Sequence, residues 1–283
     1  MSGIKEKANS MAKKRTEQAL TVKEEAPLPT YLTDFEGQTG LEGFTREDFK
    51  VPRLKLLQAL NPEVQEHSGE AMPGHFWVSS AKQQLGKEVE FIICLAKRRV
   101  ALWAPRGKSG GGILAMANDG IHWDKPNHEF EVELKGVGRR TYRTRNTVQE
   151  SRLLEWGSSN PDDKNSQPAA TLTYDYLCYM LPDGEYSPIV FSLYRTGVDT
   201  AKDLLSMLAA TRRPIQAVKV LAKVREESRA DGDFYMWSFK LNGLASEEQF
   251  KASRKIAETY AEFTAEEEDR DETRSNAADE KAF

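Results

Sequence analysis

Short runs in which hydrophobic and polar residues alternate recur along the middle of the chain. Such alternation, carried by β-branched and aromatic side chains, is typical of strands that bury one face. Turn residues precede several of the runs, as at Pro73-Gly74 and Leu85-Gly86. The pattern predicts strands at residues 75–78, 89–95, 99–103, 130–134 and 140–144.

Hairpins are predicted where two such runs flank a turn. The clearest joins residues 171–181 to 189–194 through Pro182-Asp-Gly184, and a second turns at residues 135–138. Near the end of the chain, residues 218–224 alternate, and residues 234–241 return after a turn that contains Gly232. The chain is therefore expected to be mainly β.

Two segments have helical spacing and a capping box, in which a Ser or Thr precedes an acidic or amide residue by three positions. The box at residues 200–203 opens an apolar face that Pro214 ends, and the box at residues 246–249 opens the last helix. The second helix is expected to turn Phe250, Ala257 and Tyr260 inward.

About eight or nine short strands with one helix between the late ones favour an OB-type Greek-key barrel with helical additions. An immunoglobulin-like sandwich is the alternative architecture. The expected organisation is a mostly disordered leader at residues 1–47, the OB-type domain at 48–261 and a disordered acidic tail at 262–283.

Hydrophobicity and cysteine content indicate the compartment in which the protein is expected. No apolar stretch is long enough to span a membrane, and the polar start of the chain does not fit a secretory signal. Cys94 and Cys178 are the two cysteines and lie far apart, which argues against a disulfide framework or a cysteine zinc site. We expect a cytoplasmic protein with no membrane partner.

Signals for an enzyme are weak. Gly107-Lys-Ser109 resembles the end of a phosphate-binding loop, but Leu102 stands where that motif needs its first glycine. His122 and His128 could ligate a metal, yet no third ligand has suitable spacing. We therefore expect no catalytic residue, no metal and no cofactor.

Charge is unevenly distributed. The whole chain carries a net charge of −4, but residues 262–283 hold nine acidic and three basic residues. Residues 94–145 hold eleven Lys or Arg against five Asp or Glu, a net of +6. This separation of a basic centre from an acidic tail says more about the charge of the protein's partners than the net charge of the whole chain does.

Basic and aromatic residues are interleaved from Phe76 to Arg145, and lysines continue on a later strand. Single strands of DNA are bound by such a combination, because phosphates need positive charge and bases stack on aromatic rings. Buried aromatics and solvated charges are the plainer explanation for any one of these residues. The candidate DNA-binding residues are Trp77, Lys97, Arg99, Trp103, Arg106, Lys108, Arg139, Arg140, Tyr142, Arg143, Arg145, Lys219 and Lys223.

The tail combines a run of acidic residues with a terminal aromatic. A terminal Phe stabilises nothing in a disordered segment, but it can anchor in an apolar pocket of a partner while acidic neighbours meet basic residues. A flexible polyanion can also occupy the protein's own DNA groove. The candidate partner-binding residues are Glu266, Glu267, Glu268, Asp269, Asp271, Glu272, Asp279, Glu280 and Phe283.

These features resemble bacteriophage single-stranded DNA-binding proteins. The similar stretches are Val51-Pro-Arg-Leu-Lys-Leu-Leu-Gln-Ala-Leu-Asn-Pro-Glu-Val64, Pro73-Gly-His-Phe76, residues 192–208 and the acidic tail that ends in Phe. The resemblance implies an OB-fold, binding of single strands cooperatively or as a homodimer, and recruitment of replication proteins such as a DNA polymerase or helicase by the tail. It also places the protein in the host bacterial cytoplasm. The chain departs from the family in two ways. Basic residues reduce the negative charge of its tail, and the insertions after Trp103 and Trp156 are long for a minimal OB barrel.

The expected function is binding and protection of single-stranded DNA during phage DNA replication and recombination. A phage virion or assembly protein without nucleic-acid binding is one alternative, and a single-strand annealing recombination mediator is another. The first predicts indifference to oligonucleotides, and the second predicts that pairing of strands is the main activity.

Overall fold

The computed structural model describes residues 50–104, 112–134, 138–229 and 232–261. The chain divides into two units at Lys50 and Val51, and the elements described here belong to the second unit. The strands are β1 (Leu54–Leu56), β2 (Phe76–Val78), β3 (Gln83–Gly86), β4 (Glu88–Trp103), β5 (Ile113–Ala117), β6 (Glu129–Leu134), β7 (Gly138–Arg143), β8 (Ala170–Met180), β9 (Ile189–Tyr194), β10 (Val218–Arg229) and β11 (Gly232–Leu244). The helices are α3 (Pro62–Glu66), α4 (Val148–Ser151), α5 (Val198–Ala210) and α6 (Glu247–Thr259), with short 3-10 turns at Arg195–Gly197 and Ile215–Ala217.

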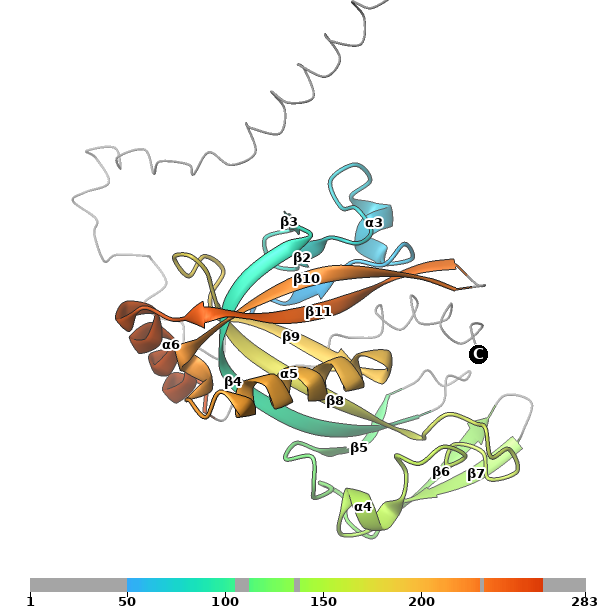
Figure 1. The fold of residues 1–283 in the computed structure, drawn as a ribbon. Helices are drawn as coiled ribbons and strands as arrows, with labels where there is room; N and C mark the ends of the chain where they lie inside the picture. The colour runs from blue at the N-terminus through green and yellow to red at the C-terminus, as the bar shows by residue number, and fades with distance from the viewer. Residues whose placement is uncertain (1–49, 105–111, 135–137, 230–231, 262–283) are drawn as a thin grey trace, which may run out of the picture. The chain divides into compact units, whose positions relative to one another are not determined.

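The largest sheet has six strands, and all of its pairs are antiparallel. Its order is β11-β10-β4-β8-β9, and β5 pairs with the far end of β4 (Figure 1). Strands β1, β2 and β3 form a second sheet, and β6 and β7 form a third. The expected mainly β fold is confirmed, but in the described part of the chain none of the sheets closes into a barrel.

Strand β4 is continuous where the sequence pattern predicts two strands, at residues 89–95 and 99–103. Its register with β8 shifts between Ile93 and Leu95, so one extra residue enters the strand there. Odd-numbered Phe91 and even-numbered Val100 consequently lie on the same face of the sheet. Because the alternation of apolar and polar residues changes phase at the extra residue, the sequence pattern resembles two separate strands. The pairing of β4 with β8 nevertheless continues on both sides of it.

The N-terminal sheet attaches to both edges of the large sheet. Arg53 forms a parallel bridge with Val190 of β9, and the Val190 N–H donates to the Pro52 carbonyl at 2.8 Å. On the other side, the Gln58 amide group exchanges two hydrogen bonds with the backbone of Tyr235 in β11, at 2.8 and 2.9 Å. The segment before β2 therefore contacts β9 and β11, the two edge strands.

Two hydrophobic cores lie on the same face of β4. The main core includes Phe91, Tyr176 and Phe191 and extends to α5. Between β9 and β11 it contains stacked rings, with the Phe191 and Trp237 centroids 4.8 Å apart. The second core gathers Val100, Trp123 and Val132 with other residues of β5, β6, β7 and α4. The segment between β4 and β8 thus folds around a core of its own.

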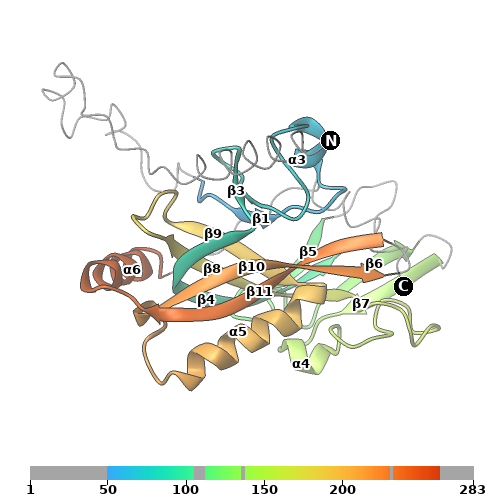
Figure 2. The same cartoon turned by 45° about the horizontal axis from the view of Figure 1, so that its top comes forward.

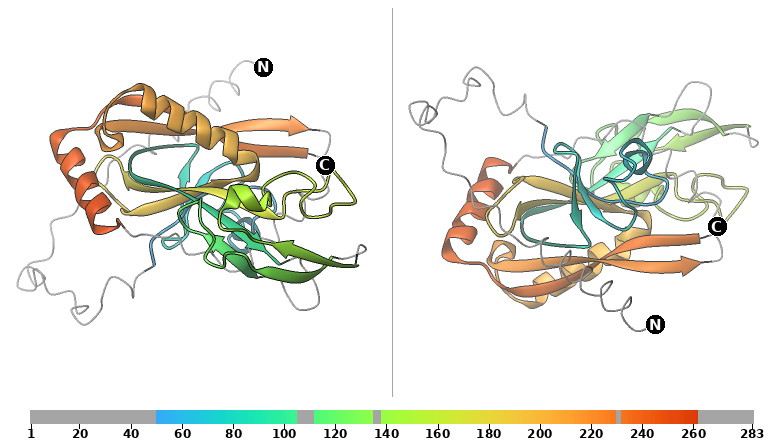
Figure 3. Two further views of the ribbon diagram at one scale, coloured as in Figure 1. Left: turned by 90° about the horizontal axis from the view of Figure 1, so that it is seen from below. Right: turned by 90° about the horizontal axis from the view of Figure 1, so that it is seen from above.

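The two long helices lie at different parts of the sheet. Figure 2 shows α5 running beside the β10–β11 hairpin, and Figure 3 shows α6 at the end of the sheet away from β6 and β7. The capping box of α6 is confirmed, because Ser246 and Gln249 cap each other's backbone N–H groups. Ala257 is buried as predicted, and Phe250 and Tyr260 are partly buried.

The predicted capping box of the earlier helix is wrong. Helix α5 begins at Val198 with Gly197 as its N-cap, so Thr200 lies inside the first turn. The 3-10 turn at Arg195–Gly197 leads directly into the helix and removes the need for a side-chain cap at Thr200. The end of the helix, at Ala210, agrees with the predicted stop before Pro214.

Candidate nucleic-acid interface

A row of polar side chains crosses three strands on the face of the sheet opposite the two cores. Residues paired across antiparallel strands share a face. Lys97 of β4 is therefore aligned with Asp175 of β8 and Ser192 of β9, and Arg99 is aligned with Thr173 and Tyr194. We call Arg53 and these six residues the polar track.

Hydrogen bonds connect the middle of the polar track. Arg53 donates to Ser192 Oγ at 3.1 Å, and Ser192 donates to Asp175 Oδ1 at 2.5 Å. The other oxygen of Asp175 accepts from Arg99 Nε at 2.5 Å. These contacts bring the guanidinium groups of Arg53 and Arg99 to one hydroxyl and one carboxylate, and the four side chains together have a formal charge of +1.

Burial divides the polar track into a floor and a margin. Arg99, Thr173 and Asp175 are buried, whereas Lys97, Ser192, Tyr194 and Arg53 are partly exposed. Toward the other end of the same face, Leu177 and Val190 pack against Ile256 and Tyr260 of α6 or just after it. Helix α6 therefore covers the apolar part of this face.

The β6–β7 hairpin presents less positive charge than its arginines suggest. Glu129, Glu131 and Glu133 of β6 are the cross-strand partners of Arg143, Thr141 and Arg139 on β7. Arg143 also forms an ion pair with Glu129. The outward face of the hairpin is consequently close to neutral, and the expected positive strand face is not found there.

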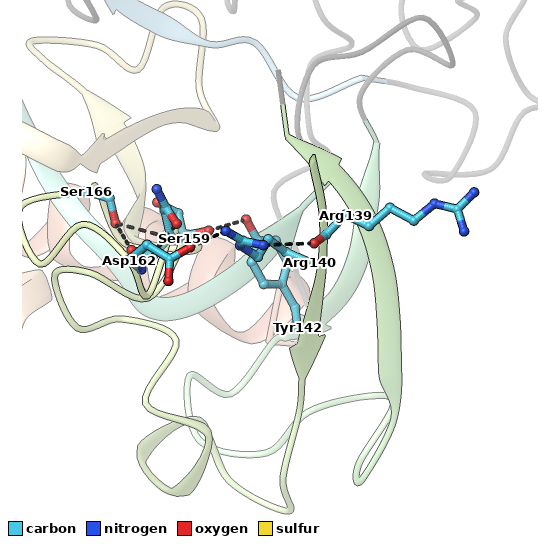
Figure 4. A network of polar contacts seen from close by, with 7 residues as sticks. Arg139, Arg140, Tyr142, Ser159, Asp162 and Ser166 are labelled. Carbon is cyan, nitrogen blue, oxygen red and sulfur yellow. Dashed lines mark hydrogen bonds and ion pairs between the residues drawn. The ribbon is translucent and has the colours of Figure 1, made fainter. Parts of the chain in front are cut away.

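Arg140 and Tyr142 lie on the other face of β7, as the alternation predicts. Figure 4 shows Arg140 turned toward Asp162 in the loop before β8, with which it forms an ion pair, while Arg139 points away. The Tyr142 hydroxyl donates to the Ser159 carbonyl at 3.3 Å, and its side chain is 4% exposed. Burial raises the pKa of Tyr142. Both residues hold the loop against β7 and do not form an open surface.

The predicted stacking aromatics are mostly enclosed. Trp77 is 1% exposed and packs with Leu57 and Ala71, so its ring offers no open face to a base. Trp103 at the end of β4 is partly buried. Trp156, in the long loop before β8, is 62% exposed. The sequence does not reveal the exposure of Trp156, because a loop has no periodic pattern from which exposure can be inferred.

The loop that carries Trp156 is held by hydrogen bonds. The Gly157 N–H donates to the Ser166 carbonyl at 2.7 Å, and Ser158 Oγ donates to the Leu153 carbonyl at 2.9 Å. Ser158 Oγ also accepts from the Ala169 N–H at 2.9 Å. The exposed indole is therefore presented by an ordered segment, which reduces the entropy that binding would cost.

The basic residues of β10 are paired with acidic residues. Lys223 contacts Glu88 at 2.5 Å, and Lys219 lies 3.9 Å from Glu90. Lys223 is directly opposite Glu88 in the register of β10 and β4, and Glu90 is opposite Leu221, two residues from Lys219. The sequence alone does not reveal this pairing. Of the remaining candidates, Arg145 is exposed, and Arg106 and Lys108 lie outside the described residues. The tail candidates between Glu266 and Phe283 also lie outside them.

The described residues were also compared with two other kinds of site, a metal-binding cluster and a membrane-spanning helix. No group of three His, Cys, Asp or Glu residues in it is arranged to hold a metal ion, and His122 contacts Asp119 at 2.7 Å. In the same residues, no helix has the length and apolar character needed to cross a membrane. Both cysteines are buried free thiols.

The chain matches a protein-family model but no individual protein of known function or structure. The family model described as Pam3 phage gp34-like protein matches residues 21–266, which include every strand and helix named above. No curated protein and no solved structure matches the chain significantly. The polar track lies entirely within the matched region.

Proposed function

We propose that this chain, which belongs to the Pam3 phage gp34-like protein family, binds single-stranded DNA along the polar track of β4, β8 and β9. The observation that carries the proposal is the chain of contacts from Arg53 through Ser192 and Asp175 to Arg99, with Lys97 beside it. Phosphates are bound by such fixed positive groups, and Tyr194 on the same face offers a ring next to them.

The strand connections support an OB-type core. The central strand β4 pairs with β8 and β10, the hairpin β8–β9 follows it, and α5 separates β9 from β10. An OB-fold is a five-stranded, partly open Greek-key barrel that binds oligonucleotides on its second and third strands. In this order β8 and β9 are the second and third strands, and both carry the polar track.

The flanking loops also match this mode of binding. OB-folds use the connection between the first two strands and the turn between the last two as walls of the groove. Here the first connection is the folded segment between β4 and β8, which carries Trp156, and the second is the tip of the β10–β11 hairpin. We propose that Trp156 extends the binding surface beyond the polar track.

The acidic tail is assigned the regulatory part of the function. We propose that residues 262–283 compete with DNA for the polar track and, when DNA displaces them, bind replication proteins through Phe283 and its acidic neighbours. Eight acidic residues between Glu266 and Glu280 supply the charge for the first role. A terminal aromatic anchor suits the second role.

Titration of tryptophan fluorescence with oligo-dT at several salt concentrations tests the proposal. Neutralising roughly five phosphates gives a slope of log K against log salt of about −3.5, at about −0.7 per contact on single strands. Duplex of the same length is expected to bind more weakly. Binding that does not depend on salt, preference for duplex, or no binding at all would refute the proposal, and the last result would favour a virion or assembly role.

A further inference from the structure

A groove separates helix α5 from the edge strand β11. It has a volume of about 830 Å³ and is lined on one side by α5 and on the other by Met236 to Phe239 of β11 together with Arg225 and Glu227 of β10. Figure 2 shows the helix and the strand beside each other. It lies on a different part of the molecule from the polar track.

The backbone of β11 is open toward the groove. In the described part of the chain, β11 pairs with β10 on one side only. Within an antiparallel ladder, alternate residues direct their N–H and C=O groups to opposite sides. The Gln58 side chain binds both backbone groups of Tyr235, so these groups point away from β10.

The same orientation extends along the strand. The register of β10 and β11 is uninterrupted from Val220 to Arg229, so Trp237 and Phe239 share the parity of Tyr235. Their N–H and C=O groups face the groove in the positions where a further strand would pair. Gln58 already takes the place of one residue of such a strand.

The lining of the groove combines apolar and acidic side chains. Met207, Met236, Trp237 and Phe239 supply apolar surface, and Trp237 stacks against Phe239 with centroids 5.7 Å apart. Asp199, Asp203 and Glu227 supply three carboxylates. Arg225 contacts Glu227 at 2.5 Å and Lys202 contacts Asp199 at 3.2 Å, so these five side chains carry a formal charge of −1. This excess of negative charge opposes the binding of nucleic acid.

We propose that this groove binds an extended segment of a partner protein in which Lys or Arg residues alternate with apolar residues. The segment adds as a strand to β11, pairing with the backbone of Trp237 and Phe239. Since side chains of a strand alternate in direction, the apolar residues on one face of the segment contact Trp237 and Phe239, while the basic residues on its other face meet Asp199 and Asp203. The partner is recognised by charge complementarity together with strand pairing.

The test uses the full-length protein and three synthetic peptides, measured by calorimetry. The probe is acetyl-Lys-Val-Lys-Val-Lys-Val-Lys-amide. A second peptide has Glu in place of each Lys, and a third has Pro in place of the central Val, which removes a backbone donor. The proposal expects the lysine peptide to bind and the other two to bind much more weakly.

Variants of the acidic rim identify the groove as the site. Asp199→Asn combined with Asp203→Asn is expected to weaken binding of the lysine peptide roughly three- to tenfold, as for two exposed ion pairs. The matched control is Glu247→Gln combined with Glu258→Gln on α6, an equal change in charge outside the groove. Equal weakening in both proteins would show that the attraction is unspecific and would overturn the proposal.

Hydrogen exchange distinguishes strand addition from surface adsorption. The amides of Trp237 and Phe239 are expected to exchange more slowly when the lysine peptide is bound. The amides of Met236 and Ser238, which point to β10, are expected to change little. Unchanged exchange at Trp237 and Phe239 in the presence of bound peptide would overturn the proposal.

Discussion

Arg99 of β4 and Asp175 of β8 form an ion pair across the sheet, with Arg99 Nε 2.5 Å from Asp175 Oδ2 and side chains 9% and 3% exposed. Removing one member of a buried pair leaves the other charge without compensation, at a cost of about 3–5 kcal/mol. We expect Arg99→Ala to lower the free energy of unfolding by about this amount, measured by urea denaturation.

An exposed pair provides the comparison for Arg99. Arg143 and Glu129 are about half exposed, and such pairs contribute about 0–1 kcal/mol. Arg143→Ala should therefore change stability little. Replacing both Arg99 and Asp175 by apolar residues of similar volume should recover much of the stability lost in Arg99→Ala. Equal effects of Arg99→Ala and Arg143→Ala would contradict our description of the pair.

Arg53 and Lys97 are the residues through which the polar track can be tested without removing its buried pair. Arg53→Gln and Lys97→Gln should each reduce the slope of log K against log salt for oligo-dT by about 0.7. The control is Lys251→Gln on α6, whose side chain is 72% exposed and contacts Glu247. An unchanged slope in both variants would place the DNA elsewhere on the protein.

Two tryptophans should respond in opposite ways to replacement by Ala. Trp77→Ala empties a buried site and should lower the free energy of unfolding by about 3–5 kcal/mol. Trp156→Ala should leave stability within about 0.5 kcal/mol but weaken oligo-dT binding by roughly 1–3 kcal/mol. Thermal unfolding and fluorescence titration separate the two effects. Normal DNA binding by a folded Trp156→Ala protein would remove this residue from the proposed interface.

Deleting residues 264–283 removes eight acidic and three basic residues, a change of +5 in net charge. If the tail competes with DNA for the polar track, the truncated protein should bind oligo-dT more tightly, most clearly at low salt where screening is weakest. Deleting Phe283 alone should leave DNA affinity unchanged but abolish capture of replication proteins in a pull-down. Identical recoveries with and without Phe283 would reduce the tail to a solubilising segment.

Both thiols should be unreactive in the folded protein. Burial raises the pKa of Cys94 to about 12 and the pKa of Cys178 well above its usual value. Because the thiolate is the reactive form, a raised pKa means that almost no reactive sulfur is present at pH 8. Labelling with a thiol reagent should require unfolding by urea, and rapid labelling of two thiols in buffer would contradict the packing around β4 and β8.

Features governed by neighbouring residues were predictable from the sequence. The cap of α6 depends on Ser246 and Gln249, three positions apart, and the β8–β9 hairpin depends on its turn and its alternation. The acidic balance of the β6–β7 hairpin was also within reach. Once residues 130–134 and 140–144 are paired through a short turn, Glu129 and Glu133 fall opposite Arg143 and Arg139.

Features governed by distant contacts were not predictable in the same way. The burial of Trp77 depends on Leu57 and Ala71, and the ion pairs of β10 depend on Glu88 and Glu90 of β4. The polar track is formed by strands that are far apart in sequence. Arg53 and Ser192, for example, meet only because the segment before β1 lies against β9.

The core of the segment between β4 and β8 has a consequence for the order of folding. Leu102 and Ala170 are paired although a long stretch of chain separates them, and closing such a loop is entropically costly. Because β5, β6, β7 and α4 pack around Trp123 and Val132, their early collapse brings the two ends together and shortens the effective loop. We therefore expect the β6–β7 amides to gain protection before those of β8 in pulse-labelled refolding. The segment between β4 and β8 would then fold first and set the register in which these two strands pair.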